Sequence, residues 1–168
     1  LDSMRYENAD FSEDVLFYKA QCLLKAGDKE EAANVYQTLT SGSQSGLANA
    51  YLGSIYMDLG RYEDAKNAFE EAARHEDNYN IYIIIYEAYA SVRREAEGAP
   101  YLEMGLEIEP ESAGDYAMVG LIYYYLENHT LARASLDTAI REGYAQAITL
   151  LGKICLEDGD VSGAKDLY

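Results

Sequence analysis

The stretch that decides the fold covers residues 52–72 and reads LGSIYMDLGRYEDAKNAFEEA. Within it, Ala65 stands twelve residues after Gly53, and the large apolar residue Phe69 follows four residues later. The same spacing recurs along the chain with a period of about 33 residues, which is typical of a repeat architecture. The equivalent alanine and large apolar residue are Ala32 and Tyr36, Ala132 and Leu136, and Ala164 and Tyr168. The chain therefore divides into about five units, near residues 13–45, 46–78, 79–112, 113–144 and 145–168.

Each unit predicts a pair of helices. Apolar residues such as Tyr51 and Ile55 recur at the steps of three and four residues that define one face of a helix. Asp28 and Ser112 stand at turns as N-cap residues, each with an acidic residue three positions later. Because two helices approach closely only where side chains are short, the glycine and alanine positions indicate the contact inside each pair. The large residues then fill the layer between neighbouring pairs.

Eight residues of the second unit stand at the positions that characterise a known repeat family: Leu52, Gly53, Tyr56, Gly60, Tyr62, Ala65, Phe69 and Ala72. On these residues and their repetition, the chain resembles the tetratricopeptide repeat family over essentially its whole length. The resemblance implies an all-α fold, a right-handed α-solenoid of about five antiparallel helical hairpins. It also implies a single repeat domain over residues 1–168, in which the first helix of each hairpin lines a concave groove.

The third unit departs from the pattern, with Tyr86 at the glycine position, no turn glycine after Ser91, and Pro100 inside the expected second helix. Since proline is tolerated only in a first turn, we expect this helix to begin near residues 99–100, after an irregular connection. That connection, residues 93–98, is expected to be the first site of limited proteolysis, after Arg93 or Arg94. The run NIYIIIY at residues 80–86 favours a strand by local propensity, but its register with the other units predicts a helix.

Composition excludes several classes of protein. The chain has 168 residues, of which 49% are hydrophobic and 26% charged, so it is not predominantly disordered. Its net charge of −17 would repel nucleic acid and anionic lipid head groups. The longest nearly uncharged apolar stretch, residues 116–126, is about half the length of a membrane span, so we expect no membrane insertion. The fifth unit stops partway through its second helix, and we therefore expect the chain to be a piece of a longer protein.

The sequence contains no constellation of catalytic or metal-binding residues. The two histidines, His75 and His129, lie in different units without metal-ligand spacing, and are interpreted as surface residues. Cys22 and Cys155 each lie in an apolar run, which predicts buried free thiols and no disulfide. We therefore expect a protein that is not an enzyme, with no cofactor and no metal. The expected location is the cytoplasm; the alternative is an extracytoplasmic lipoprotein domain whose signal has been removed.

The resemblance also implies which residues face the groove, because these lie at fixed offsets from the glycine position of each first helix. The candidate site residues are Phe17, Tyr18, Gln21, Tyr51, Ser54, Met57, Asp58, Ile83, Ile84, Glu87, Met118, Leu121, Tyr124, Tyr125 and Lys153. This lining is apolar and aromatic. Groove positions of this kind hold only two cations, Lys25 and Lys153, so a clamp for a peptide carboxylate is disfavoured.

The first helices of the third and fourth units are apolar on nearly every side, and such a helix needs a cover on its groove side. One cover is a peptide or amphipathic helix of a partner protein with an apolar segment, and this predicts a non-catalytic protein–protein interaction scaffold. A second is the protein itself, as a homo-oligomer or through a segment of its own chain. A third interpretation leaves the tyrosine hydroxyls facing water with no partner. The module could also serve as the targeting arm of a larger protein.

Overall fold

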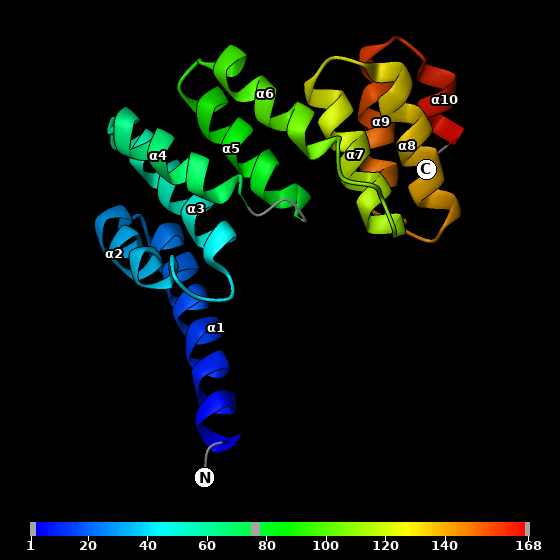
Figure 1. The fold of residues 1–168 in the computed structure, drawn as a ribbon. Helices are drawn as coiled ribbons and strands as arrows, with labels where there is room; N and C mark the ends of the chain where they lie inside the picture. The colour runs from blue at the N-terminus through cyan, green and yellow to red at the C-terminus, as the bar shows by residue number, and fades with distance from the viewer. Residues whose placement is uncertain (1–2, 75–77, 167–168) are drawn as a thin grey trace. The chain divides into compact units, whose positions relative to one another are not determined.

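The computed structural model describes residues 3–74 and 78–166, and within these ranges the regular structure consists of helices, with no strand (Figure 1). The helices are α1 (Ser3–Ala26), α2 (Lys29–Leu39), α3 (Ser45–Asp58), α4 (Tyr62–Ala72), α5 (Tyr79–Ser91), α6 (Glu95–Gly105), α7 (Ala113–Tyr125), α8 (His129–Arg141), α9 (Ala147–Glu157) and α10 (Val161–Asp166). The all-α solenoid class predicted from the sequence is confirmed. The NIYIIIY run lies inside α5, so its predicted helical structure is confirmed as well.

The chain divides into two compact units. Unit 1 comprises Leu1–Glu76 and Ile84–Gly98, and unit 2 comprises Asp77–Ile83 and Ala99–Tyr168. Within unit 1, α2 packs against α1 and α3, and α3 packs against α4. Within unit 2, α8 packs against α7 and α9, and α9 packs against α10. The single domain expected over residues 1–168 stays a prediction.

Glycines on the first helices allow the paired helices to approach, as the sequence predicts. In α3, a Cβ atom added at Gly53 would overlap the ring of Phe69 on α4, a side chain with 0% exposure. In α7, a Cβ atom at Gly120 would lie 2.7 Å from Cγ of Leu136 on α8. In these two hairpins, one large side chain of the second helix therefore packs on the bare backbone of the first.

The connection within the third hairpin is regular, contrary to the prediction from the sequence. Helix α6 begins at Glu95, several residues before the predicted start, and Pro100 lies inside it. Arg93 adopts a φ of 63°, the left-handed conformation that Gly60 adopts, at 73°, in the turn of the second hairpin. The backbone N–H of Arg94 donates to the carbonyl of Tyr89 at 3.0 Å, which closes the turn. The connection is thus a tight, regular turn, and the predicted irregular connection with a late start of α6 is wrong. Preferential proteolysis after Arg93 or Arg94 stays a prediction.

The side chain of Arg94 also stabilises this turn. Its guanidinium donates to both carboxylate oxygens of Glu97, with Nη2 2.6 Å from Oε2, and lies 5.0 Å from the ring centre of Tyr62. Within unit 1, the ion pair with Glu97 and the cation–π contact with Tyr62 together hold the first turn of α6 near α4.

The third hairpin also exchanges the sizes of its two contact residues. Tyr86 occupies the position that glycine takes in the other first helices, and Gly98 stands twelve residues later, where the other second helices have alanine. A Cβ atom at Gly98 would lie 3.1 Å from Cα of Tyr86 and 3.0 Å from Cβ of Tyr89. In this hairpin the small residue lies on α6 and not on α5. The two helices still approach closely, because glycine on one of them faces a large residue on the other.

The predicted caps and thiols can be compared with the structure directly. Asp28 accepts a hydrogen bond from the backbone N–H of Glu31, and Ser112 forms a reciprocal capping box with Asp115, so both N-caps are confirmed. Both cysteines are free. Cys155 is buried as expected, but Cys22 is exposed on α1, and the prediction for Cys22 is wrong. In the described part of the chain no helix is both long and apolar enough to cross a bilayer.

Candidate functional site

The first helices of unit 1 bring some of the candidate residues together around a buried tyrosine. The ring of Phe17 on α1 lies 5.7 Å from the ring of Tyr51 on α3, edge to face. Tyr36 of α2 stacks on Tyr51 at 5.3 Å and meets Phe17 at 5.4 Å. Phe17 and Tyr36 are buried and Tyr51 is half-buried, whereas Tyr18 is exposed to 69%. The sequence used Tyr36 only as a marker of the repeat, and its contact with both candidates depends on the packing of three helices.

Other candidates of unit 1 differ in how far a partner can reach them. Met57 is 1% exposed, so its side chain belongs to the core and is a wrong choice for a contact residue in this structure. Gln21 and Ser54 are half-buried, and Asp58 is exposed with one carboxylate oxygen 2.8 Å from Nζ of Lys29. Position on the first helix therefore does not by itself make a side chain accessible.

The candidates on α5 show the same distinction. Ile83 is buried, with 6% exposure, and packs inside the fold, so it too is not available as a contact residue. Ile84 is half-buried and Glu87 is exposed.

Unit 2 assembles the most ordered group of candidate residues, centred on Tyr124 of α7. The hydroxyl of Tyr124 donates to Oε1 of Glu157 on α9 at 3.1 Å, and Nζ of Lys153 lies 4.8 Å from the centre of its ring. The ring of His129 also stacks on Tyr124, with 5.8 Å between the ring centres. Tyr125 lies next to it, with its ring centre 5.9 Å away. Three residues selected from the sequence, Tyr124, Tyr125 and Lys153, thus lie together in the structure.

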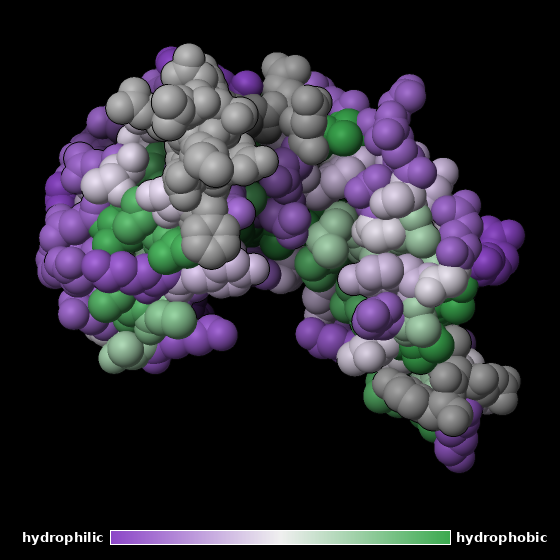
Figure 2. All heavy atoms as spheres, turned by 90° about the horizontal axis from the view of Figure 1, so that it is seen from below, coloured by the Kyte–Doolittle hydropathy of each residue, from purple (hydrophilic) through white to green (hydrophobic). Residues whose placement is uncertain are grey.

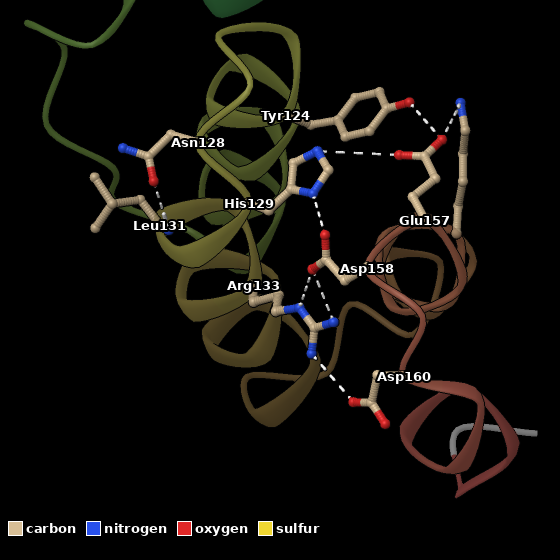
Figure 3. A network of polar contacts seen from close by, with 9 residues as sticks. Tyr124, Asn128, His129, Leu131, Arg133, Glu157, Asp158 and Asp160 are labelled. Atoms are coloured by element: carbon tan, nitrogen blue, oxygen red, sulfur yellow. Dashed lines mark hydrogen bonds and ion pairs between the residues drawn. The ribbon is translucent and has the colours of Figure 1, made fainter.

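The group continues into a polar network that joins α8 to the turn between α9 and α10 (Figure 3). Nδ1 of His129 lies 2.6 Å from Oδ1 of Asp158, and because a carboxylate only accepts, this nitrogen carries the proton. Arg133 donates to Asp158 at 3.0 Å and to Asp160 at 3.4 Å. The hydrogen bond from His129, supplemented by Arg133, holds the pKa of the Asp158 carboxyl below its ordinary value. The backbone N–H of Gly163, followed by Arg133, lowers the pKa of Asp160 in the same way.

This network was not predicted as part of the site. His129 was interpreted as a surface residue, and Arg133, Asp158 and Asp160 were not candidates. The partners lie about one repeat apart, 29 residues for His129 with Asp158 and 33 for Tyr124 with Glu157. Pairs of a carboxylate with a hydrogen-bond donor at that separation would have been the usable signal. His75 lies outside the described residues.

The arrangement fixes side chains without creating a reactive group. Its carboxylates are each paired with a cation, a hydroxyl or a backbone N–H. Within residues 3–74 and 78–166 no cluster of histidine, cysteine and acidic side chains is arranged to hold a metal ion. What the geometry provides is a half-buried aromatic ring in a fixed orientation, which is a property of recognition surfaces.

Tyr36→Phe is expected to raise the free energy of unfolding by about 1 kcal/mol, because a buried donor without a partner costs desolvation energy. The Tyr36 hydroxyl is buried with no hydrogen-bond partner among the described residues, and burial, followed by the neighbouring Tyr51, raises its pKa. Chemical denaturation measures the change.

Tyr79→Phe is the matched control, since the Tyr79 hydroxyl donates to the carbonyl of Ile108 at 2.8 Å. This variant is expected to lose about 1 kcal/mol. Equal losses in the two variants would show that the Tyr36 hydroxyl has a partner after all.

Solved structures of other proteins share this fold. The chain is similar to the thermophilic protein TTC0263 of Thermus thermophilus, a tetratricopeptide repeat protein, with 20% identity, a TM-score of 0.62, and 93% and 88% of the two chains covered. It is similar to pilF of Pseudomonas aeruginosa at 16% identity and a TM-score of 0.61, covering 95% and 74%. The structure of YrrB, described as a tetratricopeptide repeat protein with an unusual peptide-binding site, matches at 18% identity and a TM-score of 0.52, covering 90% and 80%.

These likenesses show the fold, and the sequence matches show the family. No curated protein matches the chain. Two models of the tetratricopeptide repeat match residues 14–41 and 46–79, which are the first two hairpins. With the same hairpin repeated along the rest of the described chain, the protein belongs to the tetratricopeptide repeat family.

Proposed function

We propose that this chain is a non-catalytic protein–protein interaction module that binds a peptide or amphipathic helix on the aromatic face of α7. Tetratricopeptide repeats in general are scaffolds for protein partners, and the family therefore gives the class of function. The finer statement concerns the surface, which consists of Met118, Leu121, Tyr124, Tyr125 and Lys153 and lies entirely in unit 2.

The observation that carries the proposal is the fixation of Tyr124. Its ring is half-buried, stacked on His129, covered by the ammonium of Lys153, and tied through its hydroxyl to Glu157 (Figure 3). A ring that is already held in place loses little conformational freedom when a partner docks on it. Aromatic side chains of this kind contribute most to binding when they lie at the centre of an interface.

The neighbouring side chains give the surface its apolar character. Met118, Leu121 and Tyr125 lie on α7 at steps of three and four residues, and each is half-buried. In the space-filling view, hydrophobic side chains form patches with hydrophilic side chains beside them (Figure 2). An apolar stripe of this length suits two or three anchor residues of a helix or extended segment.

Charge narrows the class of partner. The net charge of −17 repels an acidic segment and attracts one that carries lysine or arginine beside its apolar anchors. The same charge opposes close contact between two copies of the chain, so a partner of different composition is favoured over a homodimer. The description of YrrB as having a peptide-binding site is consistent with a peptide ligand on this fold.

The other accessible candidates are proposed as further contacts within unit 1. They are Tyr18, Gln21, Tyr51, Ser54, Asp58, Ile84 and Glu87.

Replacing Met118 and Leu121 together by glutamine is expected to weaken peptide binding about tenfold, a loss of about 1.4 kcal/mol, because the apolar floor beside Tyr124 is removed. Peptides are first selected from a random library on the immobilised chain, and their affinities are then measured by fluorescence anisotropy. The melting temperature is expected to stay within about 5 °C of the parent, since both side chains are only half-buried.

Met104→Gln is the matched control, because Met104 is an exposed methionine of α6 outside this surface. Equal weakening by the control and by the double variant would contradict the proposal. So would a concentration-dependent dimer that the double variant abolishes, since self-association would then be the function of this face.

A further inference from the structure

A second apolar surface lies in unit 2, along the seam between the α6–α7 connection and the α7/α8 hairpin. The seam encloses a hollow of about 380 Å³, within the size range of ligand sites. It is lined by Ile108 and Pro110 of the connection, by Val119 and Tyr123 of α7, and by Leu131 and Ala134 of α8. Apolar side chains dominate this lining.

The seam is separate from the surface proposed above. Val119 and Tyr123 are four residues apart and share one side of α7, whereas Leu121 and Tyr125 share another. A second hollow, of about 590 Å³, extends the seam along α8 and shares Ala134 and Thr138 with the first. Together the two hollows follow α8 from Leu131 to Arg141, about 15 Å at the helical rise per residue, which is enough for a short peptide segment.

One side chain of the lining is exposed to solvent. Leu131 is 43% exposed although it lines the hollow. A leucine that lies against other apolar groups and still meets water gains free energy when a partner covers it, at about 25 cal/mol per Å² of apolar surface. The seam can therefore accept an apolar side chain without any rearrangement of the hairpin.

The border of the seam is acidic. Glu107, Glu109 and Glu111 alternate with the lining residues of the connection, and Asp137 borders the second hollow on α8. All four are exposed, and none forms an ion pair with another described residue. The nearby cation, Arg141, donates to the carbonyl of Asp137 at 3.3 Å and to the hydroxyl of Thr138 at 3.0 Å, so it is directed along its own helix.

We propose that this seam docks a short partner segment in which aliphatic side chains are flanked on both sides by lysine or arginine. The aliphatic side chains would cover Val119 and Leu131, and the flanking cations would meet the unpaired carboxylates of the connection and of α8. A second copy of the chain is a poor occupant, because its net charge of −17 would face the same acidic border.

The probe is a short fluorescein-labelled peptide with leucine anchors and lysine flanks, titrated against the full chain by fluorescence anisotropy. Leu131→Arg is expected to weaken its binding about tenfold, because the new guanidinium occupies the seam and repels the lysines. Leu156→Arg is the matched control: Leu156 lies on α9 of the same unit, is 57% exposed, and does not line the seam. The control is expected to change the affinity less than about twofold.

Two altered peptides separate the contribution of the probe's leucine anchors to binding from that of its lysine flanks. Serine in place of its leucines is expected to abolish binding, and glutamate in place of its lysines is expected to do the same. Thermal melting tests whether the Leu131→Arg chain folds. If it does not fold, Leu131→Gln, which adds no charge, is used in its place and is also expected to weaken binding of the probe. The variant with glutamine at both Met118 and Leu121 is expected to bind the probe as tightly as the parent chain. The experiment can therefore contradict this proposal without contradicting the proposed function, and the reverse.

Equal weakening by Leu131→Arg and Leu156→Arg would overturn the proposal, because the probe would then be reading only the overall charge. Loss of a dimer in the Leu131→Arg chain, seen by sedimentation, would overturn it too, since the occupant would be a second copy.

Discussion

Phe69→Ala is expected to lower the free energy of unfolding by about 3–5 kcal/mol, the range for removal of a fully buried aromatic side chain. The Phe69 ring has 0% exposure, packs on the bare backbone of Gly53, and lies 5.4 Å from the ring of Tyr89. Its removal would leave a cavity between α3, α4 and α5 that rigid helices cannot collapse. Denaturation by urea, followed by circular dichroism, measures the loss.

The contact with Gly53 supplies a sharper control than a second core residue. Gly53→Ala alone is expected to destabilise the chain, because the new Cβ overlaps the Phe69 ring. In the Phe69→Leu background the same alanine has room, and the two substitutions are expected to couple with a favourable sign. Strict additivity would show that the ring and the glycine do not pack together.

Gly120→Leu is the second large effect, with an expected loss of about 1–3 kcal/mol through overpacking. A Cβ atom at this position would lie 2.7 Å from Cγ of Leu136 and 3.3 Å from the backbone oxygen of Ala132. A flexible side chain can move away, but the backbone of α8 cannot, so the larger side chain must separate the two helices. The melting temperature of the variant reports the loss.

The same helix offers the control for this prediction. Gly114 has only ordinary contacts around a potential Cβ, at 3.6 Å from Oγ of Ser112 and 4.0 Å from Tyr144. Gly114→Ala is therefore expected to stabilise the chain by about 0.4–1 kcal/mol through the reduced entropy of the unfolded state. A Gly120→Leu chain that melts like its parent would contradict the role of this glycine in helix pairing.

Most of the fold could be predicted because its determinants are local and repeated. Asp28 and Ser112 cap their helices through atoms only three residues away, and such caps are readable from the sequence. Gly53 and Phe69 are farther apart, but their spacing recurs in other hairpins, and recurrence made the contact visible. The third hairpin could not be recognised from its own residues, but its register with the neighbouring units identified it.

The third hairpin shows where local rules fail. Pro100 is unfavourable inside a helix, and that cost predicted a late start for α6. The structure begins α6 at Glu95 because Arg93 adopts the left-handed turn conformation and Gly98 packs on Tyr86. Neither a left-handed arginine nor a packing partner on another helix leaves a signal in the nearby sequence.

The sequence predicted which helix positions carry candidate site residues, but not how deeply each side chain is buried. Tyr124 and Met57 stand at the same offset from their glycines, yet Tyr124 is half-buried and Met57 is 1% exposed. Depth depends on which neighbouring helix covers the residue, and that is decided by the packing of several hairpins. The partners of Tyr124, His129 and Glu157, belong to other helices and depend on the same packing.

The exchange of Tyr86 and Gly98 affects how such repeats are found and how they change over time. A unit that has its small residue on the second helix instead of the first departs from the family pattern at both positions, although its hairpin closes. The matched residues, 14–41 and 46–79, end just where α5 begins. Glycine at residue 86 alone would remove the side chain that packs beside Gly98, and alanine at residue 98 alone would crowd the Tyr86 backbone. The two positions are therefore epistatic, and only a coordinated double change would lead from this arrangement to the usual one.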